Sequence, residues 1–162
     1  MNSPARKYFT ESVLPCHARM YAAALAITGS PDDASDAVQT AMLRVWETVS
    51  KGVILESPVS YCLSAVRNIC FTEILRNKRL VPIDGITEET SEYNRIEKAV
   101  ELTEVTDALG RLSETERRAV EMSAYSGCSA DQIAQVLGTN AVNARQILSR
   151  GRKRLRSFFN KG

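Results

Sequence analysis

The sequence predicts an all-α protein with two small helical domains joined by a flexible acidic linker, and the second domain is predicted to contain a helix-turn-helix. Apolar residues recur at helical spacing along most of the 162 residues, and β-branched residues never alternate with polar ones over a strand's length. The stretch from residue 80 to about residue 94 is acidic, contains Pro82 and Gly85, and has no periodic apolar face, which is typical of a linker. We therefore place domains at residues 1–80 and 105–162, with the linker at residues 81–104.

The net charge of +2 conceals an uneven distribution of charged residues along the chain. Residues 80–104 carry seven acidic and two basic side chains, whereas the chain from Ala141 onward carries seven basic and no acidic ones. A basic block of this kind attracts phosphate backbones, although such blocks also occur as ordinary solvated surface. The apolar content of 44% is enough for packed cores.

Composition and motifs argue against several classes of protein. There is no run of eighteen apolar residues and no signal-peptide core near the N-terminus, so we expect a cytoplasmic protein without membrane insertion. The four cysteines are widely spaced and His17 is the single histidine, which disfavours a metal site and favours buried thiols without a redox role. A P-loop, an HExxH motif and a nucleophile–base pair are all missing. We therefore predict no enzyme, no catalytic residue and no cofactor.

A first informative helix is predicted to begin at Ser30-Pro31, with Ser30 as its cap, Pro31 at its first position and Asp33 completing a capping box. Its apolar stripe consists of Ala34, Ala37, Val38, Ala41, Val45 and Val49. The opposite face carries Asp36, Gln39, Thr40, Leu43 and Glu47. Leu43 is thus an apolar residue among polar ones. It is a candidate anchor for a partner helix, although single exposed leucines are also common without a function.

A second helix is predicted from Ser57-Pro58 to about Arg79. Its buried stripe consists of Val59, Cys62, Leu63, Val66, Ile69, Cys70 and Ile74, and its far side carries Tyr61, Ser64, Asn68, Leu75 and Arg79. Basic residues at a helix end first of all complement the helix dipole. A tyrosine and an asparagine on the same face as a basic cluster also suit unstacked single-stranded bases.

The strongest motif is a helix-turn-helix from Ala130 to Leu148. Ala134 is small where the two helices would cross, Gly138 suits the turn, and Asn140 can cap the second helix. That helix would bury Ala141, Ala144, Leu148, Gly151, Leu155 and Phe159. It would expose Asn143, Gln146, Ser149, Arg150, Lys153 and Arg154. Amides and arginines on one face are typical of a recognition helix in a major groove, and the alternative is an ordinary helical hairpin with a polar outer face.

The order of these parts resembles the extracytoplasmic-function (ECF) sigma factors of the sigma-70 family over nearly the whole chain. The family's acidic helix and its leucine-arginine-x-tryptophan segment correspond to residues 32–39 and Leu43-Arg44-Val45-Trp46. The next helix corresponds at Arg67-Asn68 and the cluster 76–79, and the C-terminal domain at Ala108-Leu109, Leu112, Glu116-Arg117 and residues 149–155. The resemblance implies a non-enzymatic alternative sigma factor that binds core RNA polymerase and directs promoter-specific transcription initiation.

The resemblance also implies a role for individual residues. The coiled coil of the polymerase's largest subunit would be bound by Asp33, Asp36, Gln39, Leu43 and Arg44. The minus-ten element, with a base flipped from the melting duplex, would meet Tyr61, Ser64, Asn68, Arg76, Lys78 and Arg79. The minus-thirty-five element would meet Asn143, Arg145, Gln146, Ser149, Arg150 and Lys153. Of the basic residues here, Arg152, Lys153 and Arg154 would contact phosphates or serve as charge at the helix end. An anti-sigma factor is an expected further partner.

Some residues depart from the family pattern. Tyr61 stands where many members have tryptophan, Ala144 replaces a usual valine, Ile147 replaces a common arginine, and Val142-Asn143 replaces glycine-threonine. The docking mode is therefore better supported than any single base contact. Two other functions fit the same sequence: a stand-alone helix-turn-helix regulator that binds a palindrome as a dimer, and a sigma-like decoy that sequesters an anti-sigma factor. The regulon, inducing signal and promoter bases are not encoded in any recognisable pattern.

Overall fold

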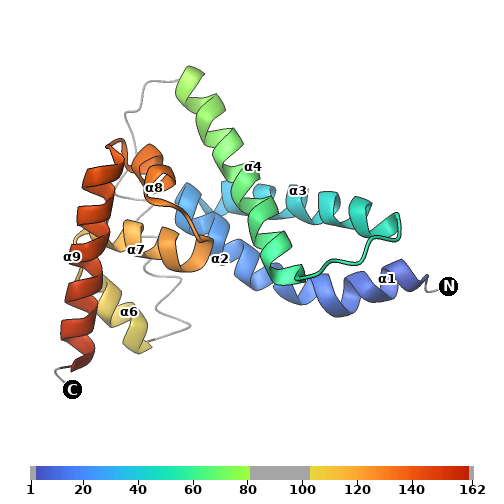
Figure 1. The fold of residues 1–162 in the computed structure, drawn as a ribbon, viewed down its shortest axis with the longest axis horizontal. Coiled ribbons are helices and arrows are strands. Elements are labelled where there is room, and N and C mark those ends of the chain that lie inside the picture. Colours follow the sequence, from blue (N-terminus) through green and yellow to red (C-terminus); the bar gives the residue numbers. More distant parts are fainter. Residues whose placement is uncertain (1–2, 81–102, 161–162) are drawn as a thin grey trace. The chain divides into compact units, whose positions relative to one another are not determined.

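The computed structural model describes residues 3–80 and 103–160, and within these residues every regular element is helical. The chain divides into two compact units, unit 1 (Met1–Pro82) and unit 2 (Ile83–Gly162) (Figure 1). The predicted all-α class with two helical domains is confirmed. The predicted linker, residues 81–104, lies outside the described residues except for its last two positions.

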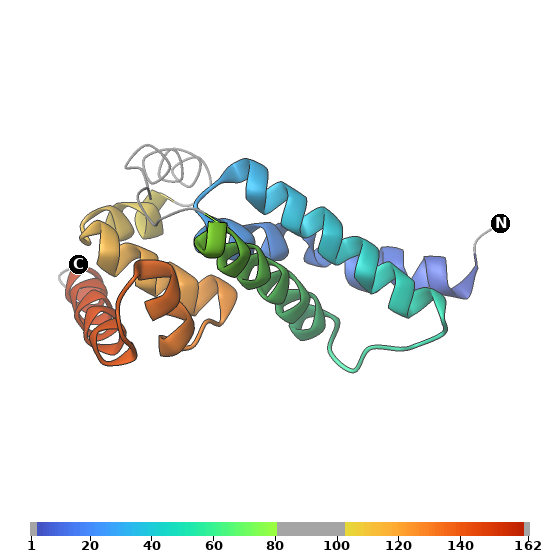
Figure 2. The ribbon, with the colours of Figure 1, turned by 90° about the horizontal axis from the view of Figure 1, so that it is seen from above.

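Unit 1 is a bundle of three long helices preceded by shorter helical segments. The chain runs through α1 (Pro4–Tyr8), a π-helical turn η1 (Phe9–Val13) and a 3₁₀ turn η2 (Leu14–Cys16) into α2 (His17–Thr28). Helices α3 (Pro31–Ser50) and α4 (Pro58–Leu80) follow. Each of α2, α3 and α4 contacts the other two, as Figures 1 and 2 show from two directions. The core of unit 1 therefore lies along the seam where these helices meet.

The junction between α2 and α3 forms by capping, but in a different way from the predicted capping box. Gly29 ends α2 in the left-handed conformation, and Ser30 Oγ accepts a hydrogen bond from the backbone N–H of Asp33 at 3.3 Å. The return bond of a capping box would need the N–H of Ser30, which instead donates to Thr28 Oγ1 at 3.2 Å. Thr28 thus takes the acceptor role that the sequence had suggested for Asp33, and the Asp33 side chain is left exposed.

The predicted apolar stripes line the core of unit 1. All six stripe residues of α3 are buried. On α4, Cys62, Val66, Ile69 and Cys70 are buried, and the remaining members of the stripe are half-buried. All four cysteines of the chain are buried thiols, as predicted. Burial and the neighbouring Cys16 thiol raise the pKa of Cys62 to about 12, so this thiol stays protonated at neutral pH.

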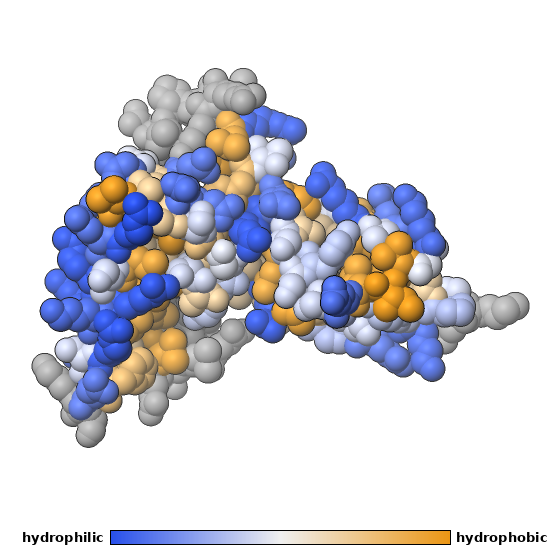
Figure 3. Space-filling view, in the orientation of Figure 1, coloured by the Kyte–Doolittle hydropathy of each residue, from blue (hydrophilic) through white to orange (hydrophobic). Residues whose placement is uncertain are grey.

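The connection between α3 and α4 is fastened to α1 through Tyr8. The Tyr8 hydroxyl accepts a hydrogen bond from the N–H of Leu55 at 3.0 Å and donates one to the carbonyl of the same residue at 3.3 Å. Leu55 is buried, whereas the preceding Val53 and Ile54 are exposed, Ile54 by 80%. Figure 3 shows this connection as an orange area of the surface. One phenol therefore satisfies both backbone groups of the residue that anchors an apolar loop.

We expect Tyr8→Phe to lower the free energy of unfolding of unit 1 by about 1–3 kcal/mol, because two partly buried backbone groups lose their partner. Trp46 is the single tryptophan and belongs to α3, so its fluorescence during urea unfolding reports on unit 1 alone. Tyr61→Phe is the control: its exposed hydroxyl makes a 3.4 Å contact with Thr48 Oγ1, and removing it should change stability by less than about 0.5 kcal/mol. Equal effects of the two substitutions would contradict the assigned role of Tyr8.

Unit 2 is built around one long helix. Helices α6 (Thr103–Gly110), α7 (Glu114–Ser126) and α8 (Ala130–Leu137) all contact α9 (Ala141–Asn160). Gly127 and Gly138 end α7 and α8 in the left-handed conformation, at φ values of 66° and 73°. Asn140 Oδ1 accepts the N–H of Asn143 at 2.8 Å and so caps α9. The helix-turn-helix of α8 and α9, its glycine turn and its asparagine cap are therefore confirmed.

Helix α7 is buried on nearly all sides, including its charged residues. Glu116, Arg117, Arg118 and Glu121 are all buried, and Arg117 Nη1 bonds Glu121 Oε1 at 3.2 Å. Glu116 Oε1 makes two contacts. It accepts a hydrogen bond from the N–H of Ser113 at 3.0 Å, which completes a capping box, and it pairs with Arg154 Nη1 at 3.3 Å. Glu116 therefore both caps α7 and ties it to α9, a role that sequence periodicity did not reveal.

Gly151 is the point of closest approach between α7 and α9. A Cβ atom at this position would lie 2.8 Å from Val120 Cγ2 and 3.3 Å from the carbonyl oxygen of Glu116. Val120 belongs to a buried cluster with Leu109 and Leu112, against which Leu148 and Leu155 of α9 pack. Glycine at residue 151 is thus a packing requirement in this chain.

We expect Gly151→Ala to destabilise unit 2 by about 1–2 kcal/mol, since overpacking against a stiff valine outweighs the roughly 1 kcal/mol that alanine gains in a helix. Urea unfolding followed by far-UV circular dichroism measures the loss, and the Trp46 transition of unit 1 should stay unchanged. Gly110→Ala is the matched control because nothing lies within 4 Å of its would-be Cβ. In a Val120→Ala background the cost of Gly151→Ala should fall by at least about 1 kcal/mol. An undiminished cost would show that Val120 is not the obstacle.

Candidate protein and nucleic-acid interfaces

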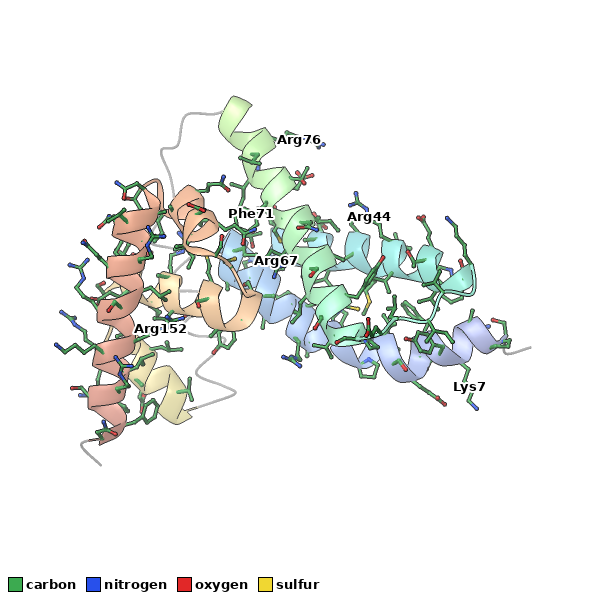
Figure 4. All side chains as sticks on the ribbon, viewed as in Figure 1. Lys7, Arg44, Arg67, Phe71, Arg76 and Arg152 are labelled. Carbon is green, nitrogen blue, oxygen red and sulfur yellow. The ribbon has the colours of Figure 1, made fainter. Side chains whose placement is uncertain are left out.

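The outward face of α3 contains one large apolar side chain surrounded by polar ones. The five residues predicted to bind core polymerase are all exposed there: Asp33, Asp36, Gln39, Leu43 and Arg44. At about 100° per residue, Leu43 lies directly opposite the buried stripe of α3, and it is 63% exposed. Arg44 points away from the bundle in Figure 4. The helix thus presents a leucine with acidic and amide neighbours to an external partner.

The outward face of α4 carries the residues predicted to bind the minus-ten element. Tyr61 is 42% exposed near the start of α4, and Asn68 and Arg76 are exposed further along. Ser64 is half-buried, and its Oγ accepts a hydrogen bond from Arg67 Nη2 at 3.4 Å. The remaining two, Lys78 and Arg79, lie in the last turn of α4, but their side chains are outside the described residues.

Arg67 and Glu73 modify this α4 face in ways that the sequence did not reveal. Arg67 brings a guanidinium beside Ser64, and Glu73 pairs with Arg76 at 3.5 Å. Both members of the Arg76–Glu73 pair are more than half exposed, so the pair is weak and a stronger anion can compete for the arginine. Figure 4 shows Arg76 directed away from the bundle near the end of α4.

Six residues of α9 are predicted to bind the minus-thirty-five element, and five of them are exposed on its outward face: Arg145, Gln146, Ser149, Arg150 and Lys153. The helix buries Ala144, Ile147 and Gly151 on its other side. Burial of Ile147 explains why an apolar residue is suitable here: it faces the core and not the outward face. Figure 3 shows a largely hydrophilic surface along α9. A single α-helix with this face has the width and the side chains to enter a major groove.

Asn143 is the exception among the six. It is half-buried, and its Nδ2 donates a hydrogen bond to Thr139 Oγ1 at 2.8 Å. It also lies about 90° from the centre of the outward face. The structure therefore places this amide at the edge of the face and engages it in the turn before α9.

The remaining basic side chains of α9 are partly occupied within unit 2. Arg154 pairs with Glu116, and Arg152 Nη2 donates to Ser123 Oγ at 2.8 Å, reaching from α9 toward α7 in Figure 4. Arg111 lies over the ring of Phe158 at 4.8 Å from its centroid. The predicted inward position of Phe159 is wrong: this ring is 51% exposed and packs edge-on against Phe158, which lies under Arg111 and is the half-buried one of the two.

The comparisons with known proteins agree with this arrangement. Residues 13–80 match the family model of sigma-70 region 2, and residues 102–155 match that of sigma-70 region 4. The ECF RNA polymerase sigma factor SigL of Mycobacterium tuberculosis, in three strains, is 31% identical over 121 residues, which cover 71% of this chain and 68% of SigL. The chain belongs to the ECF sigma factors of the sigma-70 family. It is an alternative sigma factor that directs transcription initiation, and its family binds RNA polymerase and promoter DNA.

Among solved structures, the chain is similar to the sigma factor RpoE in complex with the anti-sigma factor NepR from Bartonella quintana. The identity is 19%, the TM-score is 0.49, and the match covers 95% of this chain and 98% of that one.

Two features of the described residues bear on other functions. None of the helices there is both long and apolar enough to cross a membrane. In the same part of the chain, His, Cys, Asp and Glu side chains do not gather in groups of three that could hold a metal ion. Sigma factors are non-enzymatic initiation factors as a family, and their chemistry is that of the polymerase they bind.

Proposed function

We propose that unit 1 holds core polymerase through α3, with Leu43 inserted into the coiled coil of the largest subunit. The exposure of Leu43 at the centre of a polar helix face supports this most directly. A leucine that passes from water into a helix interface contributes roughly 1.5–3 kcal/mol, and the surrounding Asp33, Asp36, Gln39 and Arg44 would fix its register by polar contacts. The match to sigma-70 region 2 extends over all of α3.

We expect Leu43→Asp to weaken binding to core polymerase at least tenfold while unit 1 remains folded, because it puts a charge where an apolar contact is needed. Pull-down and fluorescence titration with purified core enzyme measure the loss, and Trp46 emission checks the fold. Leu14→Asp is the matched control, since Leu14 is another exposed leucine of unit 1 outside α3. Unchanged binding by Leu43→Asp would contradict the α3 docking surface.

The proposal assigns the minus-ten element to the outward face of α4. Tyr61 supplies an aromatic surface on which an unstacked base can lie, and Asn68 supplies an amide for base edges. Arg76, with Lys78 and Arg79 after it in sequence, supplies charge for the phosphate backbone. Each base that stacks on an aromatic side chain contributes roughly 1–3 kcal/mol, which would favour the melted strand over the duplex.

The minus-thirty-five element is assigned to the outward face of α9. Arg145 and Arg150 flank the centre of the face, and Gln146, Ser149 and Lys153 lie between them. Arginine and glutamine side chains can recognise guanine and adenine edges by paired hydrogen bonds. Each of the two DNA readers would be weak alone, and binding both to one polymerase raises their effective concentration to about the millimolar range.

We expect Arg150→Ala to weaken holoenzyme binding to its own promoter by about 1–3 kcal/mol if the guanidinium reads a base, with little effect on a scrambled minus-thirty-five sequence. A phosphate contact would instead weaken both DNAs alike and reduce the salt slope of binding by about one. Electrophoretic mobility shifts at several salt concentrations separate the two outcomes. An unchanged affinity for both DNAs, or promoter activity that survives charge reversal at Arg145 and Arg150, would favour the decoy function.

We further propose that the protein acts in the cytoplasm and has no enzymatic activity of its own. We expect an anti-sigma factor to cover the Leu43 face and the basic faces when polymerase is not bound. Run-off transcription with purified core enzyme on genomic fragments tests the whole proposal. Initiation at discrete start sites that depends on this chain is the expected result. Failure to initiate at any discrete site, combined with tight binding of a homodimer to DNA alone, would favour a stand-alone regulator.

A further inference from the structure

The first turn of α9 exposes one apolar side chain on the face assigned to DNA. Val142 is 59% exposed. At about 100° per residue it lies opposite the buried Ala144 and Gly151, in line with Gln146 one turn later. An isolated exposed valine usually has no function, so its surroundings must decide.

The polar neighbours of Val142 in the first turn of α9 bond to the helix start, whereas the Val142 side chain is directed outward. The Asn140 side chain accepts the N–H of Asn143 at 2.8 Å, and the Asn143 side chain donates to Thr139 at 2.8 Å. One atom of each neighbouring amide is therefore engaged in holding the start of α9. A valine in a helix has one strongly preferred rotamer, so its two methyl groups are fixed relative to α9.

We propose that Val142 recognises the C5-methyl group of a thymine in the minus-thirty-five element. The inference rests on the proposed function of α9 in the major groove. In that groove the thymine methyl is the one apolar group among the base edges, and small apolar side chains contact it. Residues at the N-terminal end of a recognition helix are those that approach base edges. Val142 is thus a specificity-determining residue that the polar set of α9 does not include.

The test removes the thymine methyl group on the DNA side and the two γ-methyl groups of Val142 on the protein side. Holoenzyme made from the full chain is bound to its promoter, and each thymine of the minus-thirty-five element, on both strands, is replaced in turn by deoxyuridine, which lacks only the methyl group. One position should weaken binding by about two- to fourfold. In Val142→Ala holoenzyme the same replacement should have no effect, and the variant alone should lose a similar factor on the unmodified promoter.

A matched control and the contrary outcomes complete the test. Val105→Ala makes the same change at an exposed valine of α6 and should keep the full deoxyuridine effect. A promoter without a methyl-sensitive thymine, or a deoxyuridine effect that persists undiminished in Val142→Ala, overturns the inference. Either result leaves the proposed function intact if the holoenzyme still initiates at that promoter. Loss of all specific initiation by the wild-type holoenzyme would instead remove the proposed function itself.

Discussion

The close contact between α7 and α9 at Gly151 determines which side of α9 faces outward. Gly151 lets the two helices approach until a Cβ would collide with Val120, and one turn further along the pair Arg154–Glu116 holds the same two helices by charge. A rotation of α9 by a single residue, about 100°, would place a side chain against Val120 and carry Gln146 and Ser149 away from the outward face. The assigned reading surface therefore depends on a packing contact made on the opposite side of the helix.

In unit 1, helix α3 likewise has one face that packs in the core and one face that is exposed. The stripe of α3 is made only of alanine and valine, so α2 and α4 can both pack closely against it. With its core contacts supplied by small residues, α3 does not need Leu43 for stability, and the leucine remains exposed at the far side. A leucine at the margin of a core can be explained by packing, but a leucine opposite the core cannot. The exposure of Leu43 therefore supports the proposal that α3 docks on a partner.

The elements that sequence predicts best are those where a local pattern and the tertiary structure demand the same residue. The α3 stripe, the cap at Ser30, Gly138 in the turn and the cap at Asn140 are of this kind. Prediction fails where a partner distant in the sequence decides. Glu116 both caps its own helix and pairs with Arg154 of α9, and neither role follows from the sequence pattern of α7. Phe159 continues the inward period of α9, yet its ring is exposed and the neighbouring Phe158 is the half-buried one.

The basic residues at the end of the chain also show where prediction from sequence fails, because some of them bond to residues that are distant in the sequence. Counted by sequence, α9 and the residues after it hold seven positive charges, but Arg154 offsets a buried carboxylate and Arg152 is bonded to Ser123. The other exposed basic side chains of α9 are Arg145, Arg150, Lys153 and Arg156, and uncharged Gln146, Ser149 and Val142 are exposed beside them. Phosphate attraction supplies affinity without sequence information, whereas contacts to base edges supply specificity. In the first turns of its outward face, α9 places uncharged Val142, Gln146 and Ser149 between Arg145 and Arg150, so side chains that can contact base edges lie beside cations that can bind either a base or a phosphate.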